Sequence, residues 1–436
     1  MSLLALSLFL TCWTNSDRVT GMVVLGPGHV VASTWGGLLE RTPDGVWKKW
    51  TTAESLPANE LKGVSGSADS LVVETPVGWF RRQSGAWVRT LPMTEGTVAK
   101  SPSGNSDSSV MKSHGPKHLD PEFALSNGRV EFIVGQDKDL VLGTAHNGVW
   151  EVKNGTWKKV PFNEPSGHDI QALAALDATV FSSTLSDGFD AWNEGQWTQV
   201  QGINPPKSIV QYEGSLWALQ SDGSVDRLQS GKWTKDVLAG VLPRKQARAM
   251  ATDGERLFVA QWGGWSVLEK GKWTHDLKRP ELAGAITTCL LCDGDQLWIG
   301  TQGRGVAVAS LVSQKVTWID ERQLLPDDWV TCLAKDSGKT YAGTFVGGLV
   351  ELDLAKVRVV TGTEGSNVTC LTHHDGALVI GTRGGLGALA DGTFKRSNDN
   401  SLNAAEVQAL FSTGPSLWVG TRAGLYRVGG PVKSVD

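Results

Sequence analysis

The sequence predicts an all-β fold, a β-propeller of about ten four-stranded blades, and two observations carry this prediction. A motif of the type LWIGT, followed by a glycine-containing turn and an apolar residue, recurs along the chain, most clearly at residues 297–301 and 417–421. Its Thr, or the Gln that replaces it, returns about every forty residues, which is the length of one blade. The aligned positions are Thr34, Thr75, Thr144, Thr184, Gln220, Gln261, Thr301, Thr344, Thr382 and Thr421.

Each repeat is predicted to hold four strands. The first strand is apolar or alternating, as in residues 330–333, and a turn with Asp and Gly follows it. The LWIGT segment is the second strand, and a short glycine-containing connection leads to a third strand such as residues 348–352. The fourth strand opens on a tryptophan after a glycine, as in Gly231-Lys232-Trp233. Short runs of Val, Ile, Thr and Trp between Gly and Asp are typical of β-hairpins, and we interpret the periodic tryptophans as wedges between blades.

The spacing also bears on how the repeats assemble. Its near constancy after Thr144 favours one closed ring of ten blades, and the alternative is an eight-bladed ring that begins at the third repeat, with two extra repeats outside it. Thr75 and Thr144 are 69 residues apart, which leaves an insertion at about residues 94–127. Because this segment is polar and rich in Ser, Gly and Pro, we expect a flexible loop within the repeats of residues 19–436.

Residues 1–18 form either a signal peptide or an N-terminal extension. The apolar stretch at residues 3–10 has the length of a signal peptide, although no Lys or Arg precedes it. Cys12 follows the stretch as in a lipoprotein cleavage site, but Thr11 stands where such a site needs a smaller residue. We expect a periplasmic or extracellular protein, with a cytoplasmic location as the alternative.

Composition excludes several classes of function. With 20% charged residues and a net charge of −4, the chain lacks the basic footprint of a nucleic-acid-binding protein. After the first dozen residues no apolar run reaches the length of a membrane-spanning helix.

Cys289, Cys332 and Cys370 hold one equivalent position that is Ala in other repeats, which indicates a small buried side chain. Neither Cys289-x-x-Cys292 nor His373-His374 supplies a complete ligand set, so we expect no metal and no cofactor.

One family resemblance rests on the clearest repeat. Residues 324–333, then Asp336, residues 341–344 and residues 348–349 resemble the two-component regulator propeller repeat, and residues 56–59 give the same Leu-Pro lead-in. The resemblance implies a propeller of the kind that forms the periplasmic sensor part of hybrid histidine kinases, some of which are thought to recognise oligosaccharides. No kinase or DNA-binding segment follows Asp436, so any signalling output is expected from a separate partner.

Propeller geometry predicts where a ligand binds. In a four-stranded meander the second-to-third and the fourth-to-first connections lie on one side, which we call the turn face. Several turns after the repeat Thr hold aromatic residues or Arg, the usual anchors of recognition sites, and Trp also suits sugar rings. The alternative is that these are ordinary solvated turn residues. The candidate ligand-binding residues are Trp35, His146, Asn147, Trp262, Arg304, Phe345, Arg383 and Arg422.

Three hypotheses of function follow. The first is a non-catalytic, sensor-like propeller that binds a glycan or a protein on the turn face. The second is a glycan-active hydrolase or lyase with a site assembled from several blades, and the third is an intracellular scaffold. Sugar hydrolysis needs two carboxylates at a defined separation, whereas Asp327 and Asp328 fall in a single connection, and no nucleophile elbow occurs. We therefore expect no catalytic residues and no enzymatic activity.

Overall fold

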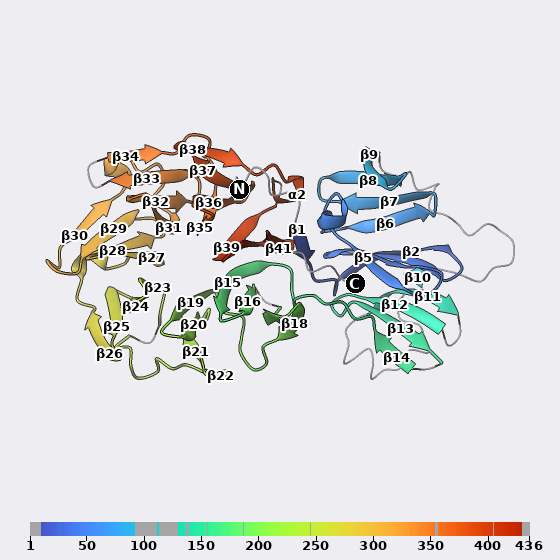
Figure 1. The fold of residues 1–436 in the computed structure, drawn as a ribbon, viewed down its shortest axis with the longest axis horizontal. Helices are drawn as coiled ribbons and strands as arrows, with labels where there is room; N and C mark the ends of the chain where they lie inside the picture. Colours follow the sequence, from blue (N-terminus) through green and yellow to red (C-terminus); the bar gives the residue numbers. More distant parts are fainter. Residues whose placement is uncertain are drawn as a thin grey trace. The chain divides into compact units, whose positions relative to one another are not determined.

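A computed structural model of the chain describes residues 10–91, 111–112, 130–136, 139–154, 156–185, 187–244, 246–353, 356–403 and 405–429. Within these residues the strands form ten antiparallel sheets, nine of four strands and one of five (Figure 1). Consecutive strands are neighbours within nine of these sheets, as in the predicted four-stranded meander, and the tenth has the order β1-β41-β40-β39. The predicted all-β architecture of propeller repeats is therefore confirmed. Of the insertion expected at about residues 94–127, only Met111–Lys112 lies inside the described part of the chain.

The chain folds as two compact units, and we call Thr11–His168 the three-sheet unit. Its inner strands pack side by side, because β2 lies beside both β6 and β11. The strands are β2 (Val19–Gly26), β3 (His29–Thr34), β4 (Gly37–Arg41), β5 (Trp47–Trp50), β6 (Gly63–Ser67), β7 (Ser70–Thr75), β8 (Gly78–Gln83), β9 (Ala86–Thr90), β10 (Met111–Lys112), β11 (Val130–Gln136), β12 (Asp139–Thr144), β13 (Val149–Lys153) and β14 (Thr156–Lys159), with the 3-10 helix η2 at Thr52–Glu54.

The other unit, Met1–Leu10 with Asp169–Asp436, is the seven-sheet unit. The boundary between the units falls within β1 (Leu10–Trp13), the fourth strand of the sheet β1-β41-β40-β39. The other strands are β15 (Ile170–Leu176), β16 (Thr179–Thr184), β17 (Phe189–Asn193), β18 (Gln196–Gln199), β19 (Ser208–Tyr212), β20 (Ser215–Leu219), β21 (Val225–Gln229), β22 (Lys232–Thr234), β23 (Ala249–Thr252), β24 (Arg256–Gln261), β25 (Gly264–Glu269), β26 (Lys272–Asp276), β27 (Thr287–Asp293), β28 (Gln296–Thr301), β29 (Val306–Ser310), β30 (Val316–Ile319), β31 (Val330–Asp336), β32 (Lys339–Thr344), β33 (Leu349–Asp353), β34 (Lys356–Val359), β35 (Val368–His374), β36 (Ala377–Thr382), β37 (Gly385–Ala390), β38 (Thr393–Arg396), β39 (Val407–Thr413), β40 (Ser416–Thr421) and β41 (Gly424–Val428). Short helices η4 (Pro280–Leu282), η5 (Glu321–Gln323) and α2 (Asn400–Asn403) lie in connections between these sheets.

The seven-sheet unit closes on itself. The first strand of each sheet packs beside the first strand of the next, in the order β15, β19, β23, β27, β31, β35 and β39, and β39 packs beside β15. In the part of the chain that the structure describes, this circuit contains seven sheets, so the predicted single ring of ten blades and its eight-bladed alternative are both wrong. The repeat spacing gives the length of each blade. Closure of the ring depends instead on the contact between β15 and β39, which cannot be inferred from the spacing.

The Thr of the repeat closes the hairpin between the second and third strands. Thr344 is fully buried, and its hydroxyl donates to the carbonyl of Gly348 at 2.8 Å. Gly348 has φ +87°, a left-handed conformation that side chains with a Cβ rarely adopt, so the Gly of the motif is required as well. The same Thr-to-Gly bond forms at Thr34, Thr75, Thr144, Thr184, Thr301, Thr382 and Thr421.

The Gly before that Thr packs against the Cys of the first strand. Cys332 lies opposite Gly343 in the register of β31 and β32, and a Cβ on Gly343 would lie 2.5 Å from Cys332 Sγ. Gly300 faces Cys289 in the same way, which agrees with the small side chain predicted at this position. Burial raises the pKa of the Cys289 and Cys332 thiols to about 12, so both stay protonated at neutral pH.

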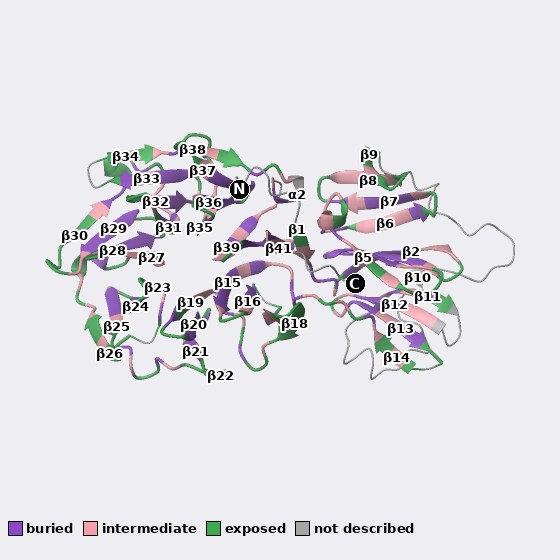
Figure 2. Cartoon of the chain, in the orientation of Figure 1, coloured by how far each residue is buried: buried purple, intermediate pink, exposed green. Residues whose placement is uncertain are grey.

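Tryptophans of the fourth strands fill the spaces between sheets. The ring of Trp233 in β22 lies 5.4 Å from that of Phe189 and 6.3 Å from that of Phe181, both in the preceding sheet. Trp273 in β26 packs against an apolar cluster that contains residues of its own sheet and of the preceding sheet, Trp217 among them. These contacts support the interpretation as wedges, although Trp157 packs among residues of its own sheet. Figure 2 shows that burial is concentrated on the second strands, such as β28, and falls towards the fourth strands.

Candidate functional site

The connections of the turn face lie side by side in the seven-sheet unit. The N–H groups of Phe345, Arg383 and Arg422, each of which follows a repeat Thr, donate to carbonyls in the connections that lead into the first strands. Phe345 donates to Trp329, and Arg422 donates to Glu406, each at 3.0 Å. A second-to-third turn and a fourth-to-first connection therefore meet in each of these sheets, as propeller geometry predicts.

Three of the candidate residues belong to one network across three neighbouring sheets. Phe345 stacks on Trp329 with ring centroids 4.3 Å apart and planes at 11°. The guanidinium carbon of Arg383 lies 5.3 Å from the centre of the Phe345 ring. Arg383 and Arg422 both pair with Glu406, at 3.3 and 3.5 Å. Both arginine side chains are more than half exposed, so these ion pairs add little to stability and leave the guanidinium groups accessible.

Trp262 stands apart from the other tryptophans of the chain. It lies in the turn between β24 and β25 and is 41% exposed, and in the part of the chain that the structure describes it is the only exposed tryptophan. The guanidinium carbon of Arg248 lies 5.4 Å from the centre of its ring. Three large aliphatic residues, Leu185, Ile286 and Val346, are also exposed in turn-face connections. Exposed apolar and cationic side chains therefore both occur on this face.

A set of residues that the sequence interpretation missed occupies the start of the first strands. We call the residue immediately before the Cys or Ala position the bridging position, because in four sheets its side chain donates a hydrogen bond towards the next sheet. Thr288 and Thr369 donate their hydroxyls to the carbonyls of Val330 and Val407, each at 2.6 Å. Around the circuit the bridging positions are Gln171, Lys207, Arg248, Thr288, Thr331, Thr369 and Gln408, assigned from the pairing of the first two strands of each sheet.

Arg304 does not join the network around Phe345. Its Nη1 donates to the carbonyl of Ala283 at 3.0 Å, and its guanidinium carbon lies 4.3 Å from the centre of the Trp318 ring in β30. The side chain therefore packs against a fourth strand and a neighbouring connection. It is nevertheless exposed on the turn face.

The remaining candidates belong to the three-sheet unit. Trp35 lies between Arg18, whose guanidinium carbon is 3.7 Å from the centre of its ring, and His168, whose ring centroid is 5.4 Å away. Asn147 is held within its own hairpin, because its N–H donates to Thr144 Oγ1 at 2.8 Å and its Oδ1 accepts from Lys159 Nζ at 3.0 Å. His146, in the same turn, is exposed.

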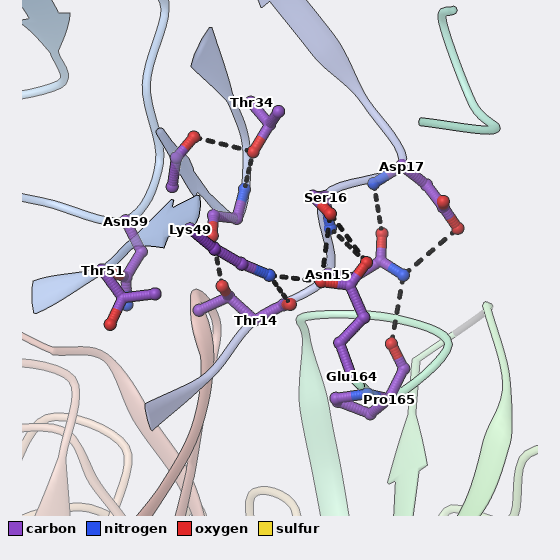
Figure 3. Close-up of polar contacts among 12 residues, drawn as sticks. Thr14, Asn15, Ser16, Asp17, Thr34, Lys49, Thr51, Asn59, Glu164 and Pro165 are labelled. Atoms are coloured by element: carbon purple, nitrogen blue, oxygen red, sulfur yellow. Dashed lines mark hydrogen bonds and ion pairs between the residues drawn. The ribbon is translucent and has the colours of Figure 1, made fainter. Parts of the chain in front are cut away.

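A polar cluster joins the start of the three-sheet unit to its end (Figure 3). Lys49 donates to the carbonyl of Thr14 and pairs with Glu164, and both charged side chains are mostly buried. Ser16 Oγ donates to Glu164 at 2.7 Å, and Asn15 Nδ2 donates to the carbonyl of Pro165 at 3.1 Å. Because Thr14, Asn15 and Ser16 are themselves buried, this cluster stabilises the unit and presents no open site.

Polar residues opposite the turn face connect neighbouring sheets. His373 lies 3.0 Å from Asp336, and His374 lies 2.9 Å from Ser412, measured between the bonded side-chain atoms. Burial lowers the pKa of His374, and Cys292 Sγ donates to Asp253. Among the described residues no three His, Cys, Asp or Glu side chains converge as metal ligands.

The adjacent carboxylates Asp327 and Asp328 hold the loop before β31. Asp327 accepts the N–H groups of Trp329 and Val346 at 2.9 and 2.7 Å. Asp328 Oδ1 accepts the N–H of Glu321 at 3.0 Å, and burial, followed by the nearby acidic groups, raises the pKa of Asp328. Both carboxylates thus order backbone around the aromatic pair of Trp329 and Phe345.

Comparison with known proteins supports the fold. No family model matches the sequence, and no curated protein matches it. The structure is similar to the extracellular domain of a protein described as a hybrid two-component system of B. thetaiotaomicron, with 14% identity, 95% of this chain and 65% of that chain covered and a TM-score of 0.53. The chain thus spans about two thirds of the length of that domain.

Two further solved structures share the fold. PorZ, an essential bacterial surface component of the type-IX secretion system of Porphyromonas gingivalis, is 12% identical over 96% of this chain and 69% of its own, with a TM-score of 0.53. A catalytically inactive variant of virginiamycin B lyase from Staphylococcus aureus, solved with quinupristin, is 11% identical over 63% of this chain and 99% of its own, with a TM-score of 0.50. At such identities the similarities establish the propeller fold alone. In the described residues no helix is long and apolar enough to span a membrane.

Proposed function

We propose that this protein is a non-catalytic, exported binding propeller whose seven-sheet unit recognises a glycan on its turn face. The observation that carries the proposal is Trp262, an exposed tryptophan in a turn, while the other described tryptophans are buried or half-buried. An aromatic ring presented by a loop on a rigid scaffold offers a flat apolar face against which a sugar ring packs. The candidates Arg304, Phe345, Arg383 and Arg422 lie on the same face and would supply hydrogen bonds and further packing.

Exposed aliphatic residues support the same face. Leu185, Ile286 and Val346 would otherwise remain in water, and apolar surface that gathers near aromatic and Arg side chains is typical of recognition sites. The similarity to an extracellular domain and to a surface component supports export. In this proposal a separate protein passes the binding event on. Trp35, His146 and Asn147 would then belong to the three-sheet unit's own surface rather than to this site.

The proposal is tested with a glycan array followed by calorimetry on the full chain. We expect Trp262→Ala and Phe345→Ala to weaken binding of the retained glycan by at least about ten-fold, with little change in melting temperature. His373→Ala is the matched control, because His373 is exposed opposite the turn face and should leave binding unaltered. Binding that survives both turn-face substitutions, or that falls equally in the control, would contradict the assignment.

Turnover separates the binding hypothesis from the enzymatic one. The lyase similarity means that the fold alone does not distinguish the two. Incubation of the retained glycan with the protein, followed by mass analysis, should return the glycan uncleaved. A shortened or unsaturated product would favour the hydrolase or lyase. A protein fractionated with the cytoplasm of its host would instead favour the intracellular scaffold.

A further inference from the structure

Two cations replace uncharged residues at consecutive bridging positions. In the described circuit the bridging residue is Thr or Gln in five sheets, whereas it is Lys207 before β19 and Arg248 before β23. The Thr residues and Gln171 use their side chains to bind a carbonyl of the next sheet. A Lys and an Arg are not needed for that bond, since an uncharged donor makes it elsewhere in the same ring.

Neither cation is neutralised by a direct contact. Within the described residues the side chains of Lys207 and Arg248 form no ion pair or hydrogen bond, and Arg248 Nε is buried without a partner. A buried donor that lacks an acceptor costs free energy, so this nitrogen favours an incoming acceptor. Lys207 and Arg248 stand immediately before neighbouring first strands, because β19 packs beside β23. Burial, followed by the charge of Arg248, lowers the pKa of Lys207.

The surrounding charges do not remove this excess. Asp222 is the carboxylate that acts on Lys207, but within the described residues the two side chains form no ion pair, and Asp222 Oδ1 accepts the N–H and the hydroxyl of Ser224, at 2.9 and 2.7 Å. A third cation, Arg244, is exposed in the connection that leads to Arg248, and its Nη2 lies near Gly263 in the turn of Trp262. Among these four charged side chains three are positive and one is negative, although the whole chain carries −4.

We propose that Lys207 and Arg248 bind a carboxylate of the ligand while Trp262 packs against the sugar ring that carries it, so that the ligand is a uronic-acid oligosaccharide. This inference rests on the proposed function and names its substrate class. Arg248 lies over the ring of Trp262 at 5.4 Å, which places charge and apolar surface within one sugar unit of each other. A guanidinium presents a planar fork that matches a carboxylate, and a lysine adds a second point of positive charge.

The test uses the full chain and a matched pair of ligands. Trigalacturonate and its methyl ester share the same sugar rings and differ in charge, so calorimetry at low salt compares recognition of the carboxylate alone. We expect the acid to bind at least about ten-fold more tightly than the ester, because only the acid offers a charged acceptor to Lys207 and Arg248.

Substitution by Gln is the structural control built into the ring, since Gln171 and Gln408 already occupy bridging positions. Arg248→Gln and Lys207→Gln should each remove most of the preference for the acid while leaving affinity for the ester unchanged. Lys335→Gln removes the same charge opposite the turn face, where Lys335 pairs with Asp293, and should change neither affinity. Trp262→Ala should weaken both ligands.

The outcomes separate the two proposals. If the ester and the acid bind equally and both depend on Trp262, the glycan face stands and the carboxylate site is wrong. Failure of acidic and neutral glycans alike to bind would overturn the proposed function itself. A sulfated oligosaccharide that binds more tightly than trigalacturonate, with the same dependence on Arg248, would overturn the assignment to a carboxylate.

Discussion

Substitution of Gly343 by Ala tests the packing that explains the Gly of the repeat. A Cβ at this position would lie 2.5 Å from Cys332 Sγ within the same sheet and 2.7 Å from Val368 Cγ1 of the next sheet. Both distances are shorter than real carbon contacts, and Val368 belongs to a first strand that is packed on both sides. One added methyl group therefore forces two neighbouring sheets apart or pushes Cys332 out of its place.

Overpacking of this kind costs about 1–3 kcal/mol, and two simultaneous clashes put Gly343→Ala near the upper end, at about 2–3 kcal/mol. For a unit of this size each kcal/mol lowers the melting temperature by about 2–4 °C, so a loss of about 4–12 °C is expected. Adding Cys332→Ala removes the clash with Sγ but keeps the clash with Val368. The double variant should therefore recover about 1 kcal/mol relative to the sum of the two single losses.

Thermal denaturation followed by circular dichroism measures both effects. Gly384→Ala is the matched control in the same unit, because the nearest atoms to its added Cβ, Arg396 Nη2 and Thr382 Oγ1, lie at 3.7 and 3.8 Å, an ordinary contact. It should melt within about 2 °C of the parent. A Gly343→Ala variant that melts like this control would refute the packing argument, and strictly additive losses in the double variant would remove Cys332 from it.

Three further predictions concern stability. Trp233→Ala should cost about 3 kcal/mol in urea unfolding, because its ring fills the space beside Phe189, and an unchanged midpoint would refute the wedge interpretation. Glu164→Gln should destabilise the three-sheet unit by about 3 kcal/mol, because it leaves Lys49 buried without its charge partner; limited proteolysis between residues 11 and 168 that is no faster than in the parent would contradict this. Because the folded pKa of Cys289 and Cys332 is raised from 9.0 to about 12, the folded chain keeps protons that the unfolded chain releases, so stability should fall as the pH rises from about 9 towards 12. A double Cys→Ala variant should lose less over this range, and equal loss would exclude the thiols as the cause.

The fold could be predicted from the sequence because the residues of the repeat make the local contacts that form each blade. Thr344 and Gly348 appear in the motif since one closes the hairpin and the other adopts its left-handed turn. Gly343 and Cys332 are both small because they face each other across two neighbouring strands. Such pairings recur in most blades, so a single sequence displays them several times.

The number of blades in the closed ring could not be predicted from the sequence, because it depends on which sheets pack against each other and not on the length of each blade. The largest irregularity in the spacing lies between Thr75 and Thr144, inside the three-sheet unit. The chain passes between the units within β1 and again between His168 and Asp169, and at the second place the spacing from Thr144 to Thr184 is an ordinary 40 residues. An insertion is visible in the sequence, whereas a change of packing partner leaves the period intact.

The candidate site that the sequence predicts covers only one of the two connections of the turn face. The turn after the Thr holds Trp262, Phe345 and Arg383, which stay predictions, whereas Lys207 and Arg248 of the later proposal lie on the other connection. The strand register places Lys207 and Arg248 at the bridging position, which holds Thr or Gln in the other first strands. The sequence alignment of the Cys and Ala positions already included the bridging position, because it is the residue immediately before them. A cation at the bridging position indicates a role other than stability, because an uncharged hydrogen-bond donor is enough to connect neighbouring sheets there. We therefore expect ligand contacts at residues that differ from the repeat pattern, and not at the residues that the repeats share.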